Sequence, residues 1–269
     1  MTRAATSSSY VCLVTGASRG IGQATAAELA RRGATVVTVG RDAHSTIACD
    51  LASFASIRSA AEEINARFPR IQLLVNNAGV QHLRRTLSGD GLEATLTVNH
   101  LAPFLLTHLL LPSLRAGSPS RVVTISSSLA RWGKIDFDDL QSEHHYNGTR
   151  AYLQSKLANI MFTASLAERL ENTGVSAVCV YPGLVMTDLM RERWWWRARW
   201  LRPLWRGLFL SPNEAAERVV VATTASTPTD TPVCFTLGGR YIRAPRRARD
   251  AAARSRLWEF SARSVGVDL

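Results

Sequence analysis

The chain has 269 residues, 46% of them hydrophobic and 20% charged, as is usual for one large globular domain. Its formal net charge is +11, yet residues 191–269 hold 15 of the 32 basic residues and only 7 of the 21 acidic ones. Because 30 of the basic residues are arginine, biased composition explains the excess better than a phosphate-binding surface, and we expect no nucleic-acid partner. The four cysteines and six histidines lack the spacing of disulfide frameworks or metal sites, so no metal is predicted.

The sequence contains no apolar run of the ~18 residues that a transmembrane helix requires. Its first residues, MTRAATSSSY, are polar and lead directly into a predicted strand, without the apolar core and cleavage site of a signal peptide. We therefore expect a cytoplasmic protein with no transmembrane segment.

Short apolar, β-branched segments alternate with segments of helical period along the chain. Buried strands are predicted at residues 10–16, 34–40, 71–77, 121–127 and 175–183, with weaker ones at 45–51 and 233–239. Helices are predicted at residues 22–33, 56–68, 91–114 and 149–174. This alternation predicts a single domain over residues 1–269 with a Rossmann-type α/β fold: a doubly wound parallel sheet of about seven strands, with helices on both faces.

The connection between the second and third strands is unusually short. Only eight residues separate Arg41, at the end of the second strand, from Asp50. A parallel crossover usually needs a dozen or more residues and contains a helix. We expect this helix to be missing, which would leave the adenosine side of a ligand site more open.

Gly16, Gly20 and Gly22 follow the first predicted strand in the sequence TGASRGIG. Between a strand and a helix, such glycines allow backbone N–H groups and the helix dipole to bind a pyrophosphate. At the end of the second strand, where an NAD site places an acid, the sequence has Arg41, and Arg19 lies in the glycine loop. Two guanidinium groups suit the 2′-phosphate of NADP(H). The alternative is that both are ordinary surface residues of an arginine-rich chain.

The segment YLQSK places Tyr152 and Lys156 four residues apart, on one face of a predicted helix. A nearby ammonium group stabilises a phenolate, so Lys156 would lower the pKa of Tyr152 and prepare it for general acid–base catalysis. The chain has only two lysines, and only one of its five tyrosines has a lysine four residues later. In a protein that uses arginine nearly everywhere, this lysine favours a functional pair.

Three further predicted strands end in residues that suit a ligand-binding crevice. TISSS (124–128) offers serine hydroxyls to a substrate carbonyl, and VNNAG (75–79) provides a tight turn beside a cofactor ribose. YPGLVMT (181–187) carries Thr187, whose hydroxyl suits the nicotinamide carboxamide. Each segment alone fits an ordinary loop, but five strand ends at one crevice favour a shared site.

Taken in order, TGASRGIG, NNAG, VNH, ISSS, YLQSK and PGLVMT resemble the short-chain dehydrogenase/reductase family over nearly the whole chain. The resemblance implies catalysis by Ser127, Tyr152 and Lys156, with Asn99 positioning a relay water. It also implies an NADP(H) site made of Gly16, Ser18, Arg19, Gly20, Ile21, Gly22, Arg41, Asp50, Leu51, Asn77, Ala78, Gly79, Tyr152, Lys156, Pro182, Gly183, Val185 and Thr187. Family members commonly pair through the helices that contain Asn99 and Tyr152, which implies a homodimer or homotetramer.

The spacing within the pattern points to one branch of the family. Ser127 and Tyr152 lie 25 residues apart, more than in most short members. The extra segment WGKIDFDDLQSEHHYNG, together with VNHLAPFLLTHLLL and AYLQSKLANIMFT, resembles the retinol-dehydrogenase-like branch. The same spacing selects Ser127 over its neighbours Ser126 and Ser128. The sequence departs from that branch in the short second crossover and in its N-terminus, where we expect no membrane anchor, so the resemblance does not extend to a retinoid substrate.

Pro103 lies four residues after Asn99 in the same predicted helix and has no N–H to donate. The carbonyl of Asn99 therefore lacks its regular helical partner and is available to a water molecule. A simple kink of a long helix is the alternative.

Three functions fit these observations to different degrees. The first is an NADP(H)-dependent carbonyl reductase or alcohol dehydrogenase that acts on a small molecule, the carbonyl or alcohol form of a bulky lipophilic compound. The second is a non-catalytic regulator or scaffold that senses NADP(H), although such proteins typically lose the tyrosine or the lysine. The third, an extended epimerase or dehydratase, needs a longer C-terminal domain than the sequence has after YPG.

The segment RERWWWRARWLRPLWRGLF (191–209) holds five of the seven tryptophans and six arginines. It begins three residues after VMTD, where the family places a mobile segment over its substrate. At helical spacing one side carries arginines and the other apolar residues: Arg199, Arg202 and Arg206 against Leu201, Leu204, Trp205 and Leu208. We interpret residues 188–212 as a substrate lid. Weak contact with an anionic membrane surface is the alternative.

Deletion of residues 194–206 should raise the KM for substrate far more than it weakens NADPH binding, because a lid contacts the substrate and not the dinucleotide. Steady-state kinetics and NADPH fluorescence titration measure the two effects separately. A larger loss of NADPH affinity than of substrate affinity would contradict the lid.

Overall fold

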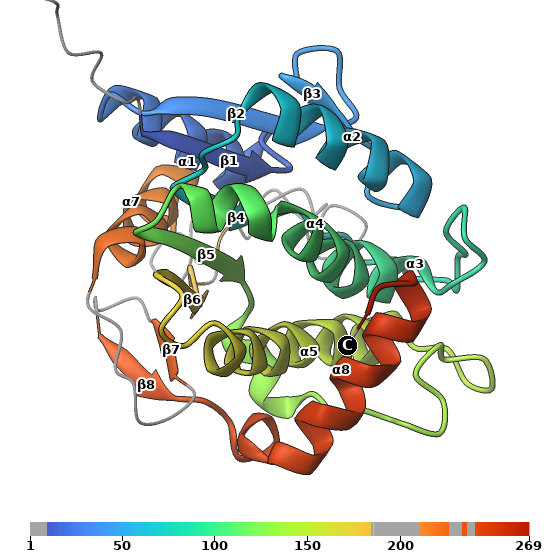
Figure 1. Cartoon of the computed structure of the whole chain (residues 1–269). Coiled ribbons are helices and arrows are strands. Elements are labelled where there is room, and N and C mark those ends of the chain that lie inside the picture. Colours follow the sequence, from blue (N-terminus) through green and yellow to red (C-terminus); the bar gives the residue numbers. More distant parts are fainter. Residues whose placement is uncertain (1–9, 184, 186–209, 226–232, 236–239, 269) are drawn as a thin grey trace, which may run out of the picture.

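The computed structural model describes residues 10–183, 185, 210–225, 233–235 and 240–268. These residues form one eight-stranded sheet with helices on both faces (Figure 1). The strand order is β3-β2-β1-β4-β5-β6-β7-β8, in which the first seven strands are parallel and β8 is antiparallel to β7. The sheet confirms the predicted doubly wound α/β fold of the Rossmann type.

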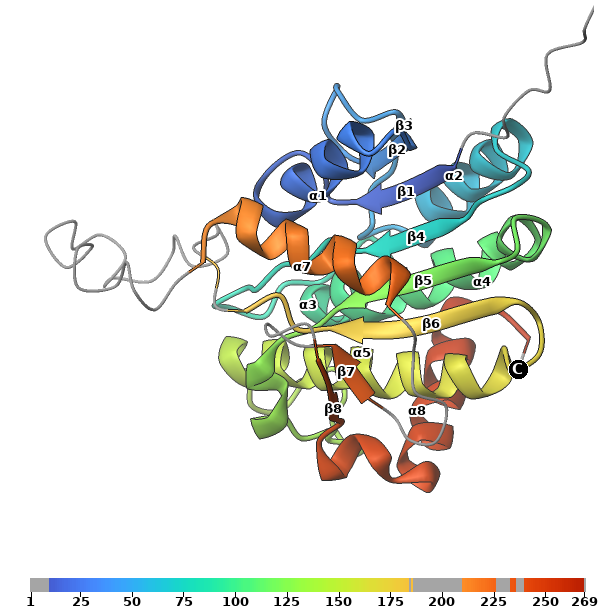
Figure 2. The same cartoon turned by 90° about the vertical axis from the view of Figure 1, so that its left-hand side faces the viewer.

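The strands are β1 (Val11–Thr15), β2 (Thr35–Gly40), β3 (Ile47–Ala48), β4 (Leu73–Asn76), β5 (Ser120–Ile125), β6 (Val175–Val180), β7 (Val233–Phe235) and β8 (Tyr241–Arg243). The α-helices are α1 (Gly20–Arg31), α2 (Phe54–Arg67), α3 (Ala94–Leu96), α4 (Ala102–Ala116), α5 (Gly148–Arg169), α7 (Pro212–Thr224) and α8 (Ala251–Val265). Shorter elements are the π-helical η1 (Thr97–Leu101) and the 3₁₀ helices η2 (Ser128–Trp132) and η6 (Arg246–Arg249). Helices α1 and α7 cover one face of the sheet, and α2, α4 and α5 cover the other (Figures 1 and 2).

All seven predicted strands are present, whereas β8, α7 and α8 were not predicted. Both missed helices carry start signals in the sequence. A capping box links Ser211 and Glu214 at the start of α7, where Pro212 occupies the first helical position. Asp250 caps α8, and Gly266 ends it in the left-handed region with φ of 64°.

The expectation of a missing helix between the second and third strands is confirmed. After β2 ends at Gly40, residues 41–46 turn back and β3 begins at Ile47. Asp42 closes this turn by accepting hydrogen bonds from the Ser45 hydroxyl and from the backbone N–H of His44. Six residues cannot form both a crossover helix and a return along the sheet, so the chain uses a side-chain-closed turn instead.

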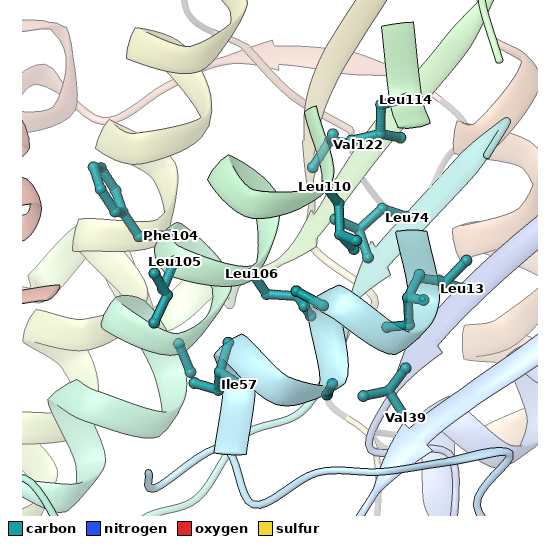
Figure 3. Packing of buried hydrophobic residues seen from close by; sticks show 14 of the residues in the cluster. Leu13, Val39, Ile57, Leu74, Phe104, Leu105, Leu106, Leu110, Leu114 and Val122 are labelled. Carbon is teal, nitrogen blue, oxygen red and sulfur yellow. The ribbon is translucent and has the colours of Figure 1, made fainter. Parts of the chain in front are cut away.

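The main core lies between the sheet and the layer of α2 and α4 (Figure 3). Leu13, Leu74 and Val122 from three adjacent strands are fully buried there. They pack with Ile57 of α2 and with leucines of α4, of which Leu106 and Leu110 are also inaccessible to solvent. Fully burying a side chain of this size contributes roughly 1.5–3 kcal/mol, so this layer holds the strand ends of the site rigidly in place.

The predicted long helix at 91–114 is interrupted by a π-helical turn. In η1 the backbone N–H of Ala102, the residue before Pro103, donates to Thr97 O, five residues back. Proline has no backbone N–H to donate, and the π-turn lets the helix continue through Pro103 without that hydrogen bond. Residues Ala94–Ala116 are long and apolar enough by composition to cross a membrane, but 83% of the apolar 18-residue window within them is buried inside the fold, as in a core helix.

The C-terminal helix α8 lies across α4 and α5 on the outside of that layer (Figure 1). Trp258 of α8 packs edge-on against Phe104, with ring centroids 4.8 Å apart, and stacks on Phe162. The guanidinium of Arg169 lies 4.0 Å from the centroid of the Trp258 ring on its outer side. Helix α8 thus covers part of the outer surface of α4 and α5.

Replacing Trp258 by Ala should lower the free energy of unfolding by about 2–3 kcal/mol, because the substitution removes a ring packed between α4 and α5. Chemical denaturation measures the change. The matched control is Trp132→Ala, since the Trp132 side chain is 58% exposed; it should shift stability by no more than about 0.5 kcal/mol. Equal losses in both variants would contradict an anchoring role for Trp258.

Candidate active site

The carboxyl ends of the parallel strands lie at one edge of the sheet (Figure 2). The strand order changes direction between the neighbouring strands β1 and β4. In doubly wound sheets the crevice at this switch point binds the ligand. The glycine loop follows β1, VNNAG ends β4, and the serines follow β5. The structure therefore brings together the motifs that the sequence places at separate strand ends.

The glycine loop is packed so closely that side chains would not fit. Gly16 has φ of 64°, and a Cβ on it would lie 2.9 Å from Cα of Ala78. A Cβ on Gly22 would collide with the Asn77 side chain and with the Gly16 carbonyl. Helix α1 begins at Gly20, so its free N–H groups face this loop. The arrangement fits a pyrophosphate, because the backbone approaches the ligand closely and the helix dipole favours an anion.

Two side chains hold the loop against the end of β4. Asn77 donates from Nδ2 to Thr15 O at 2.8 Å and to Gly16 O at 3.2 Å. The hydroxyl of Thr15 accepts from the backbone N–H groups of Asn77 and Ala78, both at 3.0 Å. Sequence reasoning identified Asn77 but missed Thr15, although this threonine directly precedes the first glycine of TGASRGIG.

Asn99 makes its hydrogen bonds through its side chain, whereas the sequence predicts that its backbone carbonyl binds a water molecule. The amide is fully buried; Oδ1 accepts from Val80 N at 2.7 Å, and Nδ2 donates to Val80 O and to Ser155 Oγ, both at 2.9 Å. These bonds join the turn after β4 to α5. A Cβ on Gly79 would lie 3.4 Å from both Asn99 Oδ1 and Lys156 Nζ, so glycine keeps the space beside the lysine open for a ribose. The carbonyl of Asn99 as a water site stays a prediction.

The three serines after β5 have different partners. Ser126 is buried and donates from Oγ to Lys156 O at 2.7 Å, which commits it to holding α5. The next residue, Ser127, has extended backbone and accepts from Leu129 N at the start of η2. Of the three serines, it is also the one whose side chain lowers the pKa of the Tyr152 phenol. Of the serines, Ser127 therefore faces the tyrosine.

Tyr152 and Lys156 lie on the same face of α5, with Nζ 5.8 Å from the centroid of the phenol ring. Burial raises the pKa of Tyr152 to about 12, and the hydrogen bond with Ser127 acts in the opposite direction. Burial lowers the pKa of Lys156 to about 8, while Nζ donates to Ile125 O at 3.0 Å. Burial, and not the lysine, dominates the pKa of the tyrosine, which stays protonated at neutral pH.

The adenosine side is formed by the turn after β2 and the residues after β3. Arg41 is exposed, and its Nε lies 4.0 Å from Asp50 Oδ1. The nearest acid in sequence, Asp42, has a lowered pKa because Ser45 and the backbone of His44 bind its carboxylate. The Asp42 carboxylate is therefore bound within its own loop. Arg41 is the other charged residue that directly follows β2. Leu51 is buried after Asp50.

Pro182 and Gly183 follow β6, and Gly183 has φ of 105°, which favours glycine. Val185 is buried and forms an isolated parallel bridge with Leu210. Thr187 and nearly all of the predicted lid at 188–212 lie outside the described residues. The bridge joins the described residues on either side of residues 186–209.

A family model described as short chain dehydrogenase matches residues 10–198. Retinol dehydrogenase 14 of Mus musculus is 37% identical over 293 residues, covering 95% of this chain and 85% of that protein. A solved structure from Mycobacterium paratuberculosis has a TM-score of 0.77 and 31% identity, covering 96% of this chain and 94% of the other. A metagenomic short-chain oxidoreductase solved in complex with NADP has a TM-score of 0.61 and 27% identity, covering 84% and 96%. The chain belongs to the short-chain dehydrogenase/reductase family and is retinol-dehydrogenase-like.

The site has the chemistry that an oxidoreductase of this family needs. The bound nicotinamide would supply or accept a hydride. Tyr152, protonated at neutral pH, is suited to donate a proton to a substrate oxygen that Ser127 binds. Lys156 lies beside the space above Gly79, where its ammonium group would contact ribose hydroxyls. Ser127, Tyr152 and Lys156 thus lie around one crevice, and Asn99 fixes its floor.

Tyr152→Phe should lower kcat by about 10²- to 10⁴-fold, because the ring remains and only the proton donor is lost. NADPH affinity, measured by fluorescence titration, should change little. Tyr146→Phe is the matched control, since its hydroxyl binds His82 O and the Glu93 carboxylate outside the crevice. Comparable turnover by Tyr152→Phe and the unmodified chain would refute the assignment.

Proposed function

We propose that this protein is an NADP(H)-dependent carbonyl reductase that reduces the ketone or aldehyde of a bulky lipophilic compound, or oxidises the corresponding alcohol. The observation that carries the proposal is the grouping of Ser127, which follows β5, with Tyr152 and Lys156 of α5; Lys156 is buried, and the other two are half-buried. Membership of an oxidoreductase family with retinol dehydrogenases among the relatives supports the reaction type.

Charge at the end of β2 supports NADP(H) over NAD(H). Arg41 is exposed there, whereas the Asp42 carboxylate is occupied within its turn. An NAD site needs a carboxylate directed at the ribose 2′-hydroxyl, and an NADP site needs a cation for the 2′-phosphate. The missing crossover helix leaves room around Arg41 for that phosphate.

The protonation state of Tyr152 supports its role as the proton donor in carbonyl reduction. With a pKa of about 12, the phenol is protonated at neutral pH and is ready to donate. In the reverse reaction, oxidation of the alcohol, the same oxygen would accept the proton as a phenolate, which burial disfavours until another group stabilises it. We therefore propose Tyr152 as the group that exchanges a proton with the substrate oxygen in both directions.

The relatives and the predicted lid support a lipophilic substrate. The name of the Mus musculus relative describes action on retinol, an apolar alcohol, by that protein. The tryptophan- and leucine-rich segment at 191–209 offers apolar surface to a substrate of the same character. We further propose that the protein is a cytoplasmic homo-oligomer, in which α8 forms part of any contact made through α4 and α5. For the arginine-rich lid, a weak contact with a membrane surface is the alternative role.

A non-catalytic NADP(H) sensor is the second candidate. A panel of aldehydes and ketones, including retinal, separates the two functions when NADPH oxidation is followed by absorbance. The reductase predicts turnover with lipophilic members of the panel; NADPH binding without turnover of any member would favour the sensor.

Arg41→Asp should lower the preference for NADPH over NADH in kcat/KM by about 10²-fold, because it replaces the cation by a carboxylate that repels the 2′-phosphate and binds the 2′-hydroxyl. Arg240→Asp, the same charge change on an exposed residue before β8, is the matched control and should leave the preference unchanged. An unchanged ratio in Arg41→Asp would contradict the cofactor assignment.

A further inference from the structure

Ser127 is held by the short helix that it starts. At the N-terminus of η2 its Oγ accepts from the backbone N–H of Leu129 at 3.2 Å, and its carbonyl accepts from Ala130 N at 3.0 Å. Because a backbone N–H occupies one lone pair of Oγ, the hydroxyl proton is available to a substrate oxygen. The direction of that hydroxyl therefore depends on the position of η2.

Helix η2 depends in turn on the segment that follows it. It has only five residues, and a 3₁₀ helix has poorer hydrogen-bond geometry than an α-helix, so it is not stable by itself. Residues 133–147, which join η2 to α5, contain no helix or strand. A segment of this length without regular structure is uncommon in a compact domain, and specific contacts have to hold it on the fold. The contacts that fix this segment therefore also fix η2.

Gln154 of α5 binds this segment at two points. It is 6% exposed; its Oε1 accepts from Asp136 N at 2.9 Å, and its Nε2 donates to Leu140 O at 3.0 Å. The acceptor of the amide meets a backbone donor and its donor meets a backbone acceptor, so both atoms are matched. Loss of the side-chain amide would leave two backbone groups of the segment without this partner.

The place of Gln154 on α5 separates it from the reacting atoms. It follows Tyr152 by two residues, and two residues of an α-helix turn by about 200°, so the two side chains leave α5 on nearly opposite sides. Gln154 therefore contacts the segment after η2, whereas Tyr152 faces the crevice.

A second contact holds the end of η2 itself. Arg247 of η6 donates from Nη1 to the carbonyl of Gly133, the C-cap of η2, at 2.6 Å. Gly133 also lies so close to α5 that a Cβ on it would be 2.5 Å from Leu153 O. The end of η2 thus lies between α5 and the C-terminal part of the chain.

We propose that Gln154 is a positioning residue for Ser127. By binding Asp136 and Leu140, it holds the segment after η2 on α5 and so keeps the Ser127 hydroxyl in place relative to Tyr152, which α5 also carries. Arg247 acts on the same segment through Gly133. The catalytic consequence rests on the proposed reductase, whereas the effect on η2 exists without turnover.

Gln154→Met tests the proposal, because methionine has a similar shape but forms neither hydrogen bond. Amide hydrogen exchange across η2, followed by mass spectrometry, should become about tenfold faster, since a segment held by fewer buried bonds opens more often. The kcat for NADPH oxidation should fall about tenfold, while the Kd for NADPH stays unchanged. The kinetic probe is the aldehyde of the panel that the unmodified protein reduces fastest. Loss of overall stability alone would not separate kcat from cofactor affinity in this way.

Asn65→Leu is the matched control. The Asn65 amide is likewise bound at both atoms, since Oδ1 accepts from Ser113 Oγ at 2.6 Å and Nδ2 donates to Leu109 O at 3.0 Å. These bonds join α2 to α4, and none of the three residues belongs to the crevice. The substitution should lower stability without changing kcat or the exchange across η2.

Arg247→Ala tests the same segment at its other contact and replaces Gln154→Met if that variant does not fold. It should speed exchange across η2 in the same direction, and Arg247→Lys, which restores a cationic donor, should reverse most of the change. Arg246→Ala, the same substitution at the exposed neighbour in η6, is its control and should change neither quantity.

Unchanged exchange across η2 in the folded variant overturns the proposal. Faster exchange with unchanged kcat also overturns it, because η2 would then move without affecting Ser127. Failure of the proposed reductase is a separate result: the unmodified protein would oxidise NADPH with no member of the panel, and the exchange measurement would still decide whether Gln154 holds η2.

Discussion

The hydrogen bond between the Lys156 ammonium group and the Ile125 carbonyl ties the catalytic helix to the centre of the sheet. Its acceptor ends β5 and its donor lies in the third turn of α5, so the bond sets the position of that helix relative to the end of β5. Ser126 adds a second tie in the opposite sense, from its hydroxyl to the Lys156 carbonyl. Both ties are buried, and a buried polar group left without its partner costs about 1–3 kcal/mol. Ser127 and Tyr152 face each other because these two bonds hold β5 and α5 in register.

The other wall of the crevice depends on close approach of backbone to backbone. The hydroxyl of Thr15 and the amide of Asn77 together hold the glycine loop against the end of β4. No side chain fits at Gly16 or Gly22, so these residues leave the N-terminus of α1 open toward the crevice. Asn99 then joins this wall to α5 through Val80 and Ser155. These bonds are buried or part-buried, so water competes with them only in part, and together they stiffen this wall.

Local pattern was sufficient for the fold class and for most of the candidate site. Buried parallel strands have continuous apolar sequences, and the ends of such strands necessarily lie at one edge, so the positions of Tyr152, Lys156 and the glycine loop follow from periodicity. The absence of a helix after β2 also followed from chain length alone. In contrast, helices α7 and α8 were missed despite their capping residues; in α8 the few large apolar residues lie among arginines. The partners of Asn99 and Ser126 were missed too, since nothing in a linear sequence shows which backbone group a side chain will meet.

The sequence by itself determined the family, the doubly wound sheet, the glycine loop and the tyrosine–lysine pair, because spacing and residue type are local properties. Only the tertiary structure decided that Asp42 turns away from the ribose side, that Ser126 holds the helix while Ser127 faces the tyrosine, and that burial raises the pKa of Tyr152. It also decided that α8 packs against His100, 161 residues earlier in the chain. These features depend on burial and on contacts between distant segments, and both arise only when the helices close over the sheet.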